Sequence, residues 1–385
     1  MKLFGSQRKA LTMVFSIVLL LLLAACGNTG GGAGTPTTSA PVNGKGCTKV
    51  GILLPETSTS ERWAKKDTPL LQQDVKAALP AGSTIDFANA ELDPTKQQSQ
   101  AEADLTKGDC ILVVAAVDSD AAAAIVAKAK VKNVPVIAYD RLIQSKDLAY
   151  YVSFDNVKVG ELQGQYVVDH YKDPAYGVSA GHNNLVMING AQTDNNALLF
   201  SQGAHNKLDP LITGGQLKKV YEQFTPLWNN DTARTEMDGA LTANSNNVQV
   251  AYVANDGMAN SVIASLKAKK LNGKVLVTGQ DATVAGIQNI LTSDQSMTVY
   301  KAITKEAQAT ADLVKALYNG SDTSSLTNGA TTKTSAAAGS VAIPSVLETP
   351  VAVDKSNVAS TVIADGFVTK AEVCQGLPAG TGGIC

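Results

Sequence analysis

The chain has 385 residues and is mildly acidic, with 32 Lys and Arg against 34 Asp and Glu. Because the charges are well mixed and their balance is negative, the chain lacks the basic footprint of a nucleic-acid-binding protein. Hydrophobic residues make up 44% of the sequence, and the length favours two lobes, each with its own core, over a single one.

Residues 1–25 have the pattern of a bacterial lipoprotein signal peptide. A short basic segment precedes an apolar run from Leu11 to Leu23, which is too short to cross a bilayer comfortably as a transmembrane anchor. The run ends in Leu-Ala-Ala-Cys at 23–26, the pattern of a lipobox. We therefore expect cleavage before Cys26, a lipid on its thiol, and a protein held at the outer face of the cytoplasmic membrane.

Residues 26–46 contain mainly Gly, Thr, Pro and Ala, a composition typical of a flexible tether. The glycines at 30–32 do not indicate a phosphate-binding loop, because no predicted strand precedes them and no predicted helix follows.

From Lys49 onward, short apolar runs alternate with longer amphipathic stretches. The predicted strands of the first half are Val50–Leu54, Thr84–Ala88, Ile111–Ala115 and Val134–Tyr139. The helical stretches lie near Glu61–Ala78, Pro94–Lys107 and Asp120–Lys130. Strands separated by helix-length segments indicate right-handed βαβ units and a parallel sheet covered by helices.

The same alternation resumes after Asn156 with a helix that reaches Tyr171. The predicted strands are Leu185–Asn189, Leu217–Glu222, Val248–Ala254, Lys274–Thr278 and Met297–Tyr300. The predicted helices are Asn195–Leu208, Asp231–Asn244 and Met258–Lys269. Residues 320–339 are expected to form a loop, and Val341–Val353 and Ser360–Phe367 have strand character.

The predicted fold class is therefore α/β, with two doubly wound parallel-sheet lobes. We expect an N-terminal lobe from 47–155 plus 303–338 and a C-terminal lobe with a tail from 156–302 plus 339–385. The three connections of the hinge would fall near 153–157, 301–304 and 338–342.

Four cysteines remain once Cys26 is lipidated, and they allow three pairings. Cys47 precedes the first predicted strand and Cys110 the third, so both lie at one sheet edge if these strands are neighbours. This placement favours the pairs Cys47–Cys110 and Cys374–Cys385. The sequence lacks a Cys-x-x-Cys motif and histidines at metal-ligand spacing, so we expect structural disulfides, no metal and no cofactor.

Polar and aromatic residues follow nearly every predicted strand, where the sites of such sheets form. They are Arg62 and Trp63, Asp140 and Arg141, Asn195 and Asn196, Trp228, Asn255, Asp281 and Lys301. Carboxylates accept hydrogen bonds from sugar hydroxyls, Arg, Lys and Asn side chains donate to them, and an indole matches the apolar face of a pyranose. These residues favour a sugar site in which Trp63 and Trp228, the only two tryptophans, sandwich the ring.

Structural roles compete with this interpretation. The alternatives are core packing for each tryptophan, a surface ion pair for Asp140 with Arg141, and a solvated side chain for Lys301. Asn255, Asp256 and Asp231 lie where helices need caps, and we assign Asp256 to capping rather than ligand contact.

Several stretches resemble the xylose-binding branch of the periplasmic sugar-binding proteins that serve ABC importers. They are Glu61–Trp63, Val136–Arg141, Ser153–Gln163, Asp194–Ala197, Ala240–Asn244, Gly279–Ala282, Met297–Lys301 and Pro344–Pro350. They follow the family's order from about Lys49 to Phe367. The chain departs from the family at Thr57–Ser60, which leaves the pocket rim open, and at the Cys374–Cys385 extension, which should concern stability alone.

The resemblance implies that all ten strand-end residues named above contact the ligand, with Asn195 beside Asn196. It also implies a monomeric, non-enzymatic receptor that closes on one monosaccharide and delivers it to an ABC permease. D-Xylose is the favoured ligand, with glucose next. Galactose, arabinose, a furanose, and a chemoreceptor or sensor kinase as partner stay open.

Two other functions fit less well. Gly177–Gly181 matches the Gly-x-Ser-x-Gly pattern of serine hydrolases around Ser179, with His182 adjacent, but the predicted strand follows the serine instead of preceding it. Neither His182 nor the two other histidines, His170 and His205, lies at a predicted strand end. A transcription regulator of the lac-repressor kind shares the fold, but the signal peptide and the absence of an N-terminal DNA-binding helix pair exclude it.

Overall fold

The computed structural model describes residues 43–385, which lie within one compact unit. The predicted signal peptide, Cys26 and most of the expected tether lie outside the described residues. The last tether residues are packed, since the Gly46 N–H donates to the carbonyl of Tyr318 at 2.8 Å. Between residues 43 and 385, each helix is too short or too polar to span a bilayer.

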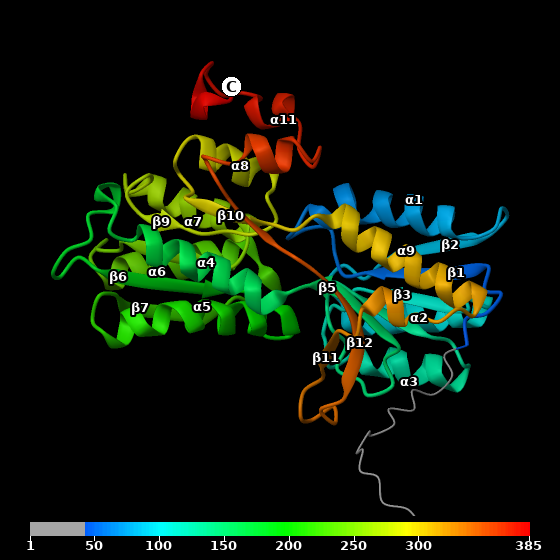
Figure 1. The fold of residues 1–385 in the computed structure, drawn as a ribbon. Helices are drawn as coiled ribbons and strands as arrows, with labels where there is room; N and C mark the ends of the chain where they lie inside the picture. The colour runs from blue at the N-terminus through cyan, green and yellow to red at the C-terminus, as the bar shows by residue number, and fades with distance from the viewer. Residues whose placement is uncertain (1–42) are drawn as a thin grey trace, which may run out of the picture. The chain divides into compact units, whose positions relative to one another are not determined.

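The first sheet has seven strands in the order β11-β12-β5-β4-β3-β1-β2 (Figure 1). Its strands are β1 (Lys49–Leu54), β2 (Thr84–Asn89), β3 (Ile111–Val114), β4 (Val136–Tyr139), β5 (Tyr150–Phe154), β11 (Thr331–Lys333) and β12 (Ala342–Glu348). Paired strands run parallel except β11, which is antiparallel to β12.

Helices cover both faces of this sheet. On one face α1 (Thr68–Ala78) packs against α9 (Ile303–Asn319), and on the other α2 (Pro94–Lys107) packs against α3 (Ala123–Val131). Successive residues of β1 accordingly join different cores, Ile52 with α1 and Leu53 with α2. A strand buried on both faces is apolar throughout, which explains why these strands appear in the sequence as continuous hydrophobic runs.

The second half of the chain builds a parallel four-stranded sheet in the order β7-β6-β8-β9 and an antiparallel pair, β10 with β13. The strands are β6 (Asn184–Asn189), β7 (Lys218–Phe224), β8 (Val250–Val253), β9 (Leu276–Val277), β10 (Met297–Tyr300) and β13 (Val351–Asp354). The helices are α4 (Asn156–His170), α5 (Asn195–Thr213), α6 (Asn230–Ala243), α7 (Asp256–Ala268) and α8 (Val284–Leu291). The α/β class with mainly parallel sheets is thus confirmed.

Three connections join the two groups of strands, and the third differs from the prediction. Two run from β5 to α4 and from β10 to α9, near the expected positions. The third lies between β12 and β13, at 348–351 and not at 338–342. Ser345–Glu348 pair in parallel with β5, so the assignment of all of 339–385 to the C-terminal lobe is wrong for β12. The stretch predicted as one strand is two strands in different sheets, interrupted at Pro350, which lacks an N–H to donate.

Three other predictions of local structure are wrong. Residues 320–339 are not a plain loop, since they contain α10 (Ser324–Thr327) and β11. The stretch with strand character at 360–367 contains a helical turn, Ala359–Ile363. Strand β5 was missed, although it lies at the centre of the first sheet beside β4. In the first two cases tertiary contacts override a weak local preference, whereas the aromatic and β-branched residues of β5 themselves favour a strand.

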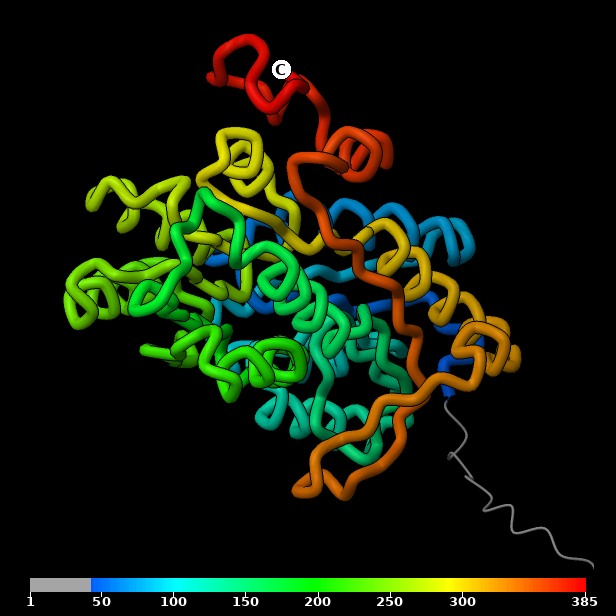
Figure 2. The backbone as a smooth tube through the Cα atoms, turned by 60° about the vertical axis from the view of Figure 1, so that its left-hand side comes forward, coloured from blue at the N-terminus to red at the C-terminus, as the bar shows by residue number. Residues whose placement is uncertain are grey.

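The structure forms both expected disulfides, Cys47–Cys110 and Cys374–Cys385. The first lies where the paired strands β1 and β3 begin. The second closes the C-terminal tail after α11 (Lys370–Cys374), which packs against α8 (Figure 2).

Candidate functional site

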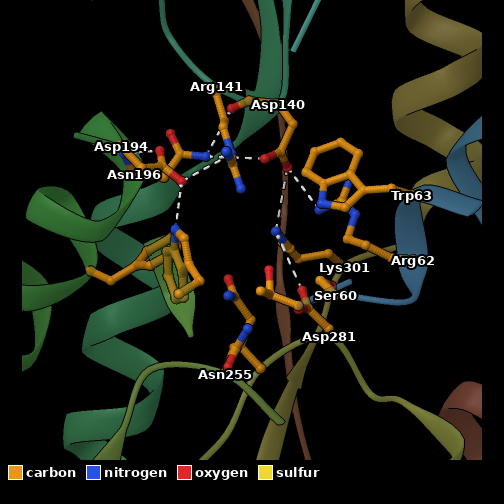
Figure 3. A pocket seen from close by; sticks show the side chains of 14 residues that line it. Ser60, Arg62, Trp63, Asp140, Arg141, Asp194, Asn196, Asn255, Asp281 and Lys301 are labelled. Carbon is orange, nitrogen blue, oxygen red and sulfur yellow. Dashed lines mark hydrogen bonds and ion pairs between the residues drawn. The ribbon is translucent and has the colours of Figure 1, made fainter. Parts of the chain in front are cut away.

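A cavity lies where the loops at the carboxyl ends of strands from both sheets meet (Figure 3). Its side chains approach one another closely and leave a small, partly open space between them. Nine of the ten predicted contact residues line it: Arg62, Trp63, Asp140, Arg141, Asn196, Trp228, Asn255, Asp281 and Lys301. Five further residues complete the lining: Thr59, Ser60, Asp194, Phe200 and Gln280.

The loop after β1 is shaped by a buried carboxylate. Glu56 accepts hydrogen bonds from the backbone N–H groups of Thr59 (2.6 Å) and Ser60 (3.0 Å). This turn leads into a helical segment, Trp63–Asp67, that presents Arg62 and Trp63 to the cavity. Thr59 and Ser60 therefore form part of the pocket rim, whose residues could not be predicted from the sequence.

Arg62 is held by three carboxylates. Its guanidinium contacts both oxygens of Asp67 (2.7 and 2.9 Å), Asp140 Oδ2 (2.8 Å) and Glu306 Oε2 (3.0 Å). Glu306 and Asp67 are fully buried, and Asp67 also accepts from the Tyr139 hydroxyl. Charge-assisted bonds of this kind fix the direction of the guanidinium before any ligand arrives.

Asp140 is the acceptor at the centre of the site. Burial alone would raise the pKa of this carboxyl, but the positive charges of Arg62, Lys301 and Arg141 outweigh burial and hold its pKa well below the usual range. Lys301 Nζ lies 3.4 Å from Asp140 Oδ2 and 3.6 Å from Asp281 Oδ1, so it links the acidic residues of two loops.

Asp194 belongs to the site although the sequence assigned it no ligand role. Its carboxylate caps α5 by accepting from the Asn196 N–H, lies 3.0 Å from Arg141 Nε, and accepts from Trp228 Nε1 at 3.2 Å. Burial raises the pKa of Asp194, and the charge of Arg141 opposes this rise. An aspartate directly before a helix is expected to cap that helix, so only its burial and its partner Arg141 indicate that Asp194 also belongs to the cavity.

Asn195 and Asn196 point in different directions. Asn196 donates to the Asp140 carbonyl at 2.9 Å and accepts from the Asn156 side chain, at the cavity wall. Asn195 lies outside the lining, and its side chain accepts from Gln144 Nε2 at 2.8 Å. Adjacent residues on a helix project about 100° apart, so Asn195 is the one predicted contact residue that the structure does not bring to the cavity.

The loops before α7 and after β9 complete the cavity. The cap of α7 is Asn255, whose Oδ1 accepts from the Met258 N–H, so the assignment of capping to Asp256 is wrong. Asp256 instead lies fully buried and accepts from Thr283 N, Thr298 Oγ1 and Gln295 Nε2. Burial raises the pKa of Asp256 to about 7. Asp256 thereby ties the 279–283 loop, which carries Gln280 and Asp281, to β10.

Both tryptophans line the same cavity. The Arg62 guanidinium stacks on the Trp63 ring at 4.5 Å and that of Arg141 lies 5.3 Å from it. The Trp63 side chain is buried, and its Nε1 has no hydrogen-bond partner among the described residues. Phe200, one helical turn after Asn196, lies edge-on to Trp228 with ring centroids 6.3 Å apart.

The motif around Ser179 is not a nucleophile elbow. Ser179 and His182 exchange backbone hydrogen bonds across an exposed turn before β6, and His182 Nδ1 lies 2.8 Å from Asn247 Oδ1. A nucleophile elbow requires the serine between a strand and a following helix. Neither residue lines the cavity.

The chain matches known proteins over most of its length. The family model described as a periplasmic binding protein domain matches residues 50–322. The D-xylose-binding periplasmic protein of Haemophilus influenzae is 37% identical over 328 residues, covering 84% of this chain and 92% of that protein. The protein of the same name from Escherichia coli is 35% identical over 84% of this chain and 92% of its own length.

Solved structures of related proteins have a similar fold. The crystal structure of an ABC transporter solute-binding protein from Clostridium phytofermentans with bound β-D-glucose superposes with a TM-score of 0.73 at 30% identity, covering 84% of this chain and 99% of that one. The fold is the type I fold of periplasmic binding proteins. The chain belongs to the periplasmic binding protein family.

Proposed function

We propose that this protein is an extracytoplasmic receptor that binds one neutral monosaccharide in the cavity and delivers it to an ABC importer. The charge balance of the cavity carries the proposal. Its lining holds three cationic side chains, Arg62, Arg141 and Lys301, and three carboxylates, Asp140, Asp194 and Asp281. These groups pair with one another, so a ligand need bring no charge but many hydroxyls.

D-Xylose is the favoured ligand. This choice rests on the two relatives that bear that name, which are 37% and 35% identical to this chain. Glucose is the alternative, because a structural neighbour at 30% identity holds β-D-glucose. The two sugars differ by an exocyclic hydroxymethyl group, and the loop at Thr59 and Ser60 is one wall that would admit or exclude it.

Calorimetry tests the proposal on chain 27–385, which contains the whole compact unit. D-Xylose, D-glucose, L-arabinose and D-galactose are titrated beside the anion D-glucuronate. One neutral aldose should bind at one site per chain, and glucuronate should not bind. The absence of binding by every neutral sugar would refute the proposal.

The variant Asp281→Asn keeps the size of the side chain and removes a charged acceptor, so it should weaken sugar binding by about tenfold to a hundredfold. Asp169→Asn makes the same change at an exposed position of α4 and should bind like the wild type. If both variants bind the sugar with the same affinity, Asp281 does not contact the ligand.

We also propose that lipidation at Cys26 anchors the receptor as a monomer, with residues 27–42 as the tether. In fractionated cells the wild type should sediment with membranes, and Cys26→Ser should be released or retained as an uncleaved precursor. Equal membrane attachment and processing of both forms would contradict the anchor without affecting the sugar site.

A further inference from the structure

Three aspartates converge at the end of the first sheet opposite the cavity. Asp86 is the third residue of β2, Asp104 lies in the last turn of α2, and Asp109 lies two residues before β3. One carboxylate oxygen from each lies within 4.8 Å of the others. Because the cavity occupies the carboxyl ends of the strands, this cluster is separate from it.

Two of these carboxylates are buried, and each has one oxygen without a hydrogen-bond partner among the described residues. Asp104 is 3% exposed and Asp109 is 2% exposed, and within residues 43–385 the Oδ2 of each has no hydrogen-bond partner. Both oxygens converge above Gly51 of β1, where a Cβ would lie 2.9 Å from Asp104 Oδ2 and 3.0 Å from Asp109 Oδ2. Glycine at this position leaves room for them.

The neighbouring lysines compensate only part of the charge of the cluster. Lys107 Nζ lies 3.2 Å from Asp104 Oδ1 and 3.5 Å from Asp86 Oδ2, with its side chain 57% exposed. Lys49 Nζ donates to the Lys107 carbonyl. No side chain of the described residues donates to Asp109. The buried Asp109 carboxylate thus faces two other carboxylates without a side-chain donor among the described residues, so its negative charge is costly unless a cation compensates it.

We propose that Asp86, Asp104 and Asp109 bind a hard divalent cation such as Ca²⁺, with water completing its coordination. Ca²⁺ takes oxygen ligands in flexible geometry, and the three carboxylates outnumber the two nearby lysines, Lys107 and Lys49, so negative charge is left for the ion to compensate. The ion would tie β2, α2 and the start of β3 together beside the Cys47–Cys110 disulfide.

The test measures Ca²⁺ binding to chain 27–385 by calorimetry and thermal unfolding in chelated buffer with and without CaCl₂. The wild type should bind one Ca²⁺ and unfold at a higher temperature when it is present. Asp109→Asn should lose both responses, and in chelated buffer it should be no less stable than the wild type, because a repelling charge is gone. Glu102→Gln, on the exposed side of the same helix α2, should keep both responses.

Sugar affinity, measured in parallel, should be the same with and without Ca²⁺ and in Asp109→Asn, so the outcome is independent of the proposed receptor function. The proposal is overturned if millimolar Ca²⁺ neither binds nor raises the unfolding temperature. It is also overturned if Asp109→Asn responds like the wild type.

Discussion

At the scale of single residues, the cavity is built from side chains that serve two purposes. Asn255 caps α7 with its oxygen while lining the cavity, and Asp194 caps α5 while pairing with Arg141. Side chains of this kind satisfy backbone N–H groups that have no partner within the first turn of a helix. The site therefore uses residues that also stabilise local structure, and burial distinguishes the second role from the first.

The two indoles provide a direct reporter of the site. Because Trp63 and Trp228 are the only tryptophans and both line the cavity, sugar binding should change the intrinsic fluorescence. Trp228→Phe removes the donor to Asp194, and Trp63→Phe removes an indole N–H that has no partner among the described residues. Fluorescence titrations of the two variants should each keep a sugar-dependent signal from the remaining indole. A variant whose signal no longer responds would show that its remaining tryptophan does not sense the ligand.

A histidine outside the cavity makes stability depend on pH. His205 of α5 lies 2.8 Å from Glu222 and 2.7 Å from Asp209. The hydrogen bond to Glu222 is the main cause that raises the pKa of His205, and the same bond lowers the pKa of Glu222 to about 2. A raised histidine pKa stabilises the fold below about 6.5, and this contribution is lost as pH rises through the folded pKa. A lowered glutamate pKa stabilises above about 4.3 and is lost toward pH 2.

The pair should therefore contribute most between about pH 4.5 and 6.5. His205→Gln should lose on the order of 1 kcal/mol of unfolding free energy at pH 6 and less at pH 8.5, in urea titrations at both values. His182→Gln serves as the control, because His182 is exposed and its imidazole lies beside an amide oxygen, Asn247 Oδ1, and not beside a carboxylate. A loss that is equal at both pH values would contradict the assignment.

At the scale of elements, α4 and α5 pack with their backbones in near contact. A Cβ at Gly160 would lie 1.9 Å from the Phe200 carbonyl oxygen, and one at Gly203 would lie 2.0 Å from the Val157 carbonyl oxygen. Since α5 carries Asn196 and Phe200, the close crossing determines how far these side chains reach into the cavity.

Gly160→Ala should force the helices apart and lower the unfolding free energy by roughly 1–3 kcal/mol in urea titrations. Gly239→Ala makes the same change inside α6, where a Cβ would meet nothing within 4 Å. It should be neutral or stabilising by up to about 1 kcal/mol. If both variants behave alike, the crossing tolerates a side chain and the close approach is not required.

At the scale of the whole molecule, contacts outside the cavity join the loops of the two sheets. Asn195 accepts from Gln144 and donates through its backbone to Ser119 Oγ at 3.1 Å, while the Ser119 N–H donates to the Thr193 carbonyl. These bonds favour the arrangement in which the loops meet. A ligand that binds this arrangement gains affinity from every contact that stabilises it.

Asn195→Ala should therefore weaken sugar binding by a few-fold up to about tenfold, the equivalent of one net hydrogen bond, without touching the ligand. Small-angle scattering should show a larger fraction of opened molecules in the absence of sugar. Asn196→Ala, one residue away and inside the cavity, should cost more in calorimetry. If both variants lose the same amount of sugar affinity, Asn195 contacts the ligand as well.

The sequence by itself determined the α/β class, most strands and helices, both disulfides and the presence of nine of the predicted residues at one cavity. It did so because buried parallel strands are continuous apolar runs and because the carboxyl ends of such strands meet at one edge. Each of these properties is local in the chain or follows from strand order.

Only the tertiary structure decided the features that depend on which residues meet across the fold. In the structure β12 pairs with β5 and so belongs to the first sheet. The Asn195 side chain points away from the cavity, and Asn255, not Asp256, caps α7. The tertiary structure also assembled Asp86, Asp104 and Asp109 from separate elements. Strand pairing and side-chain direction are set by long-range packing, which no short stretch of sequence contains.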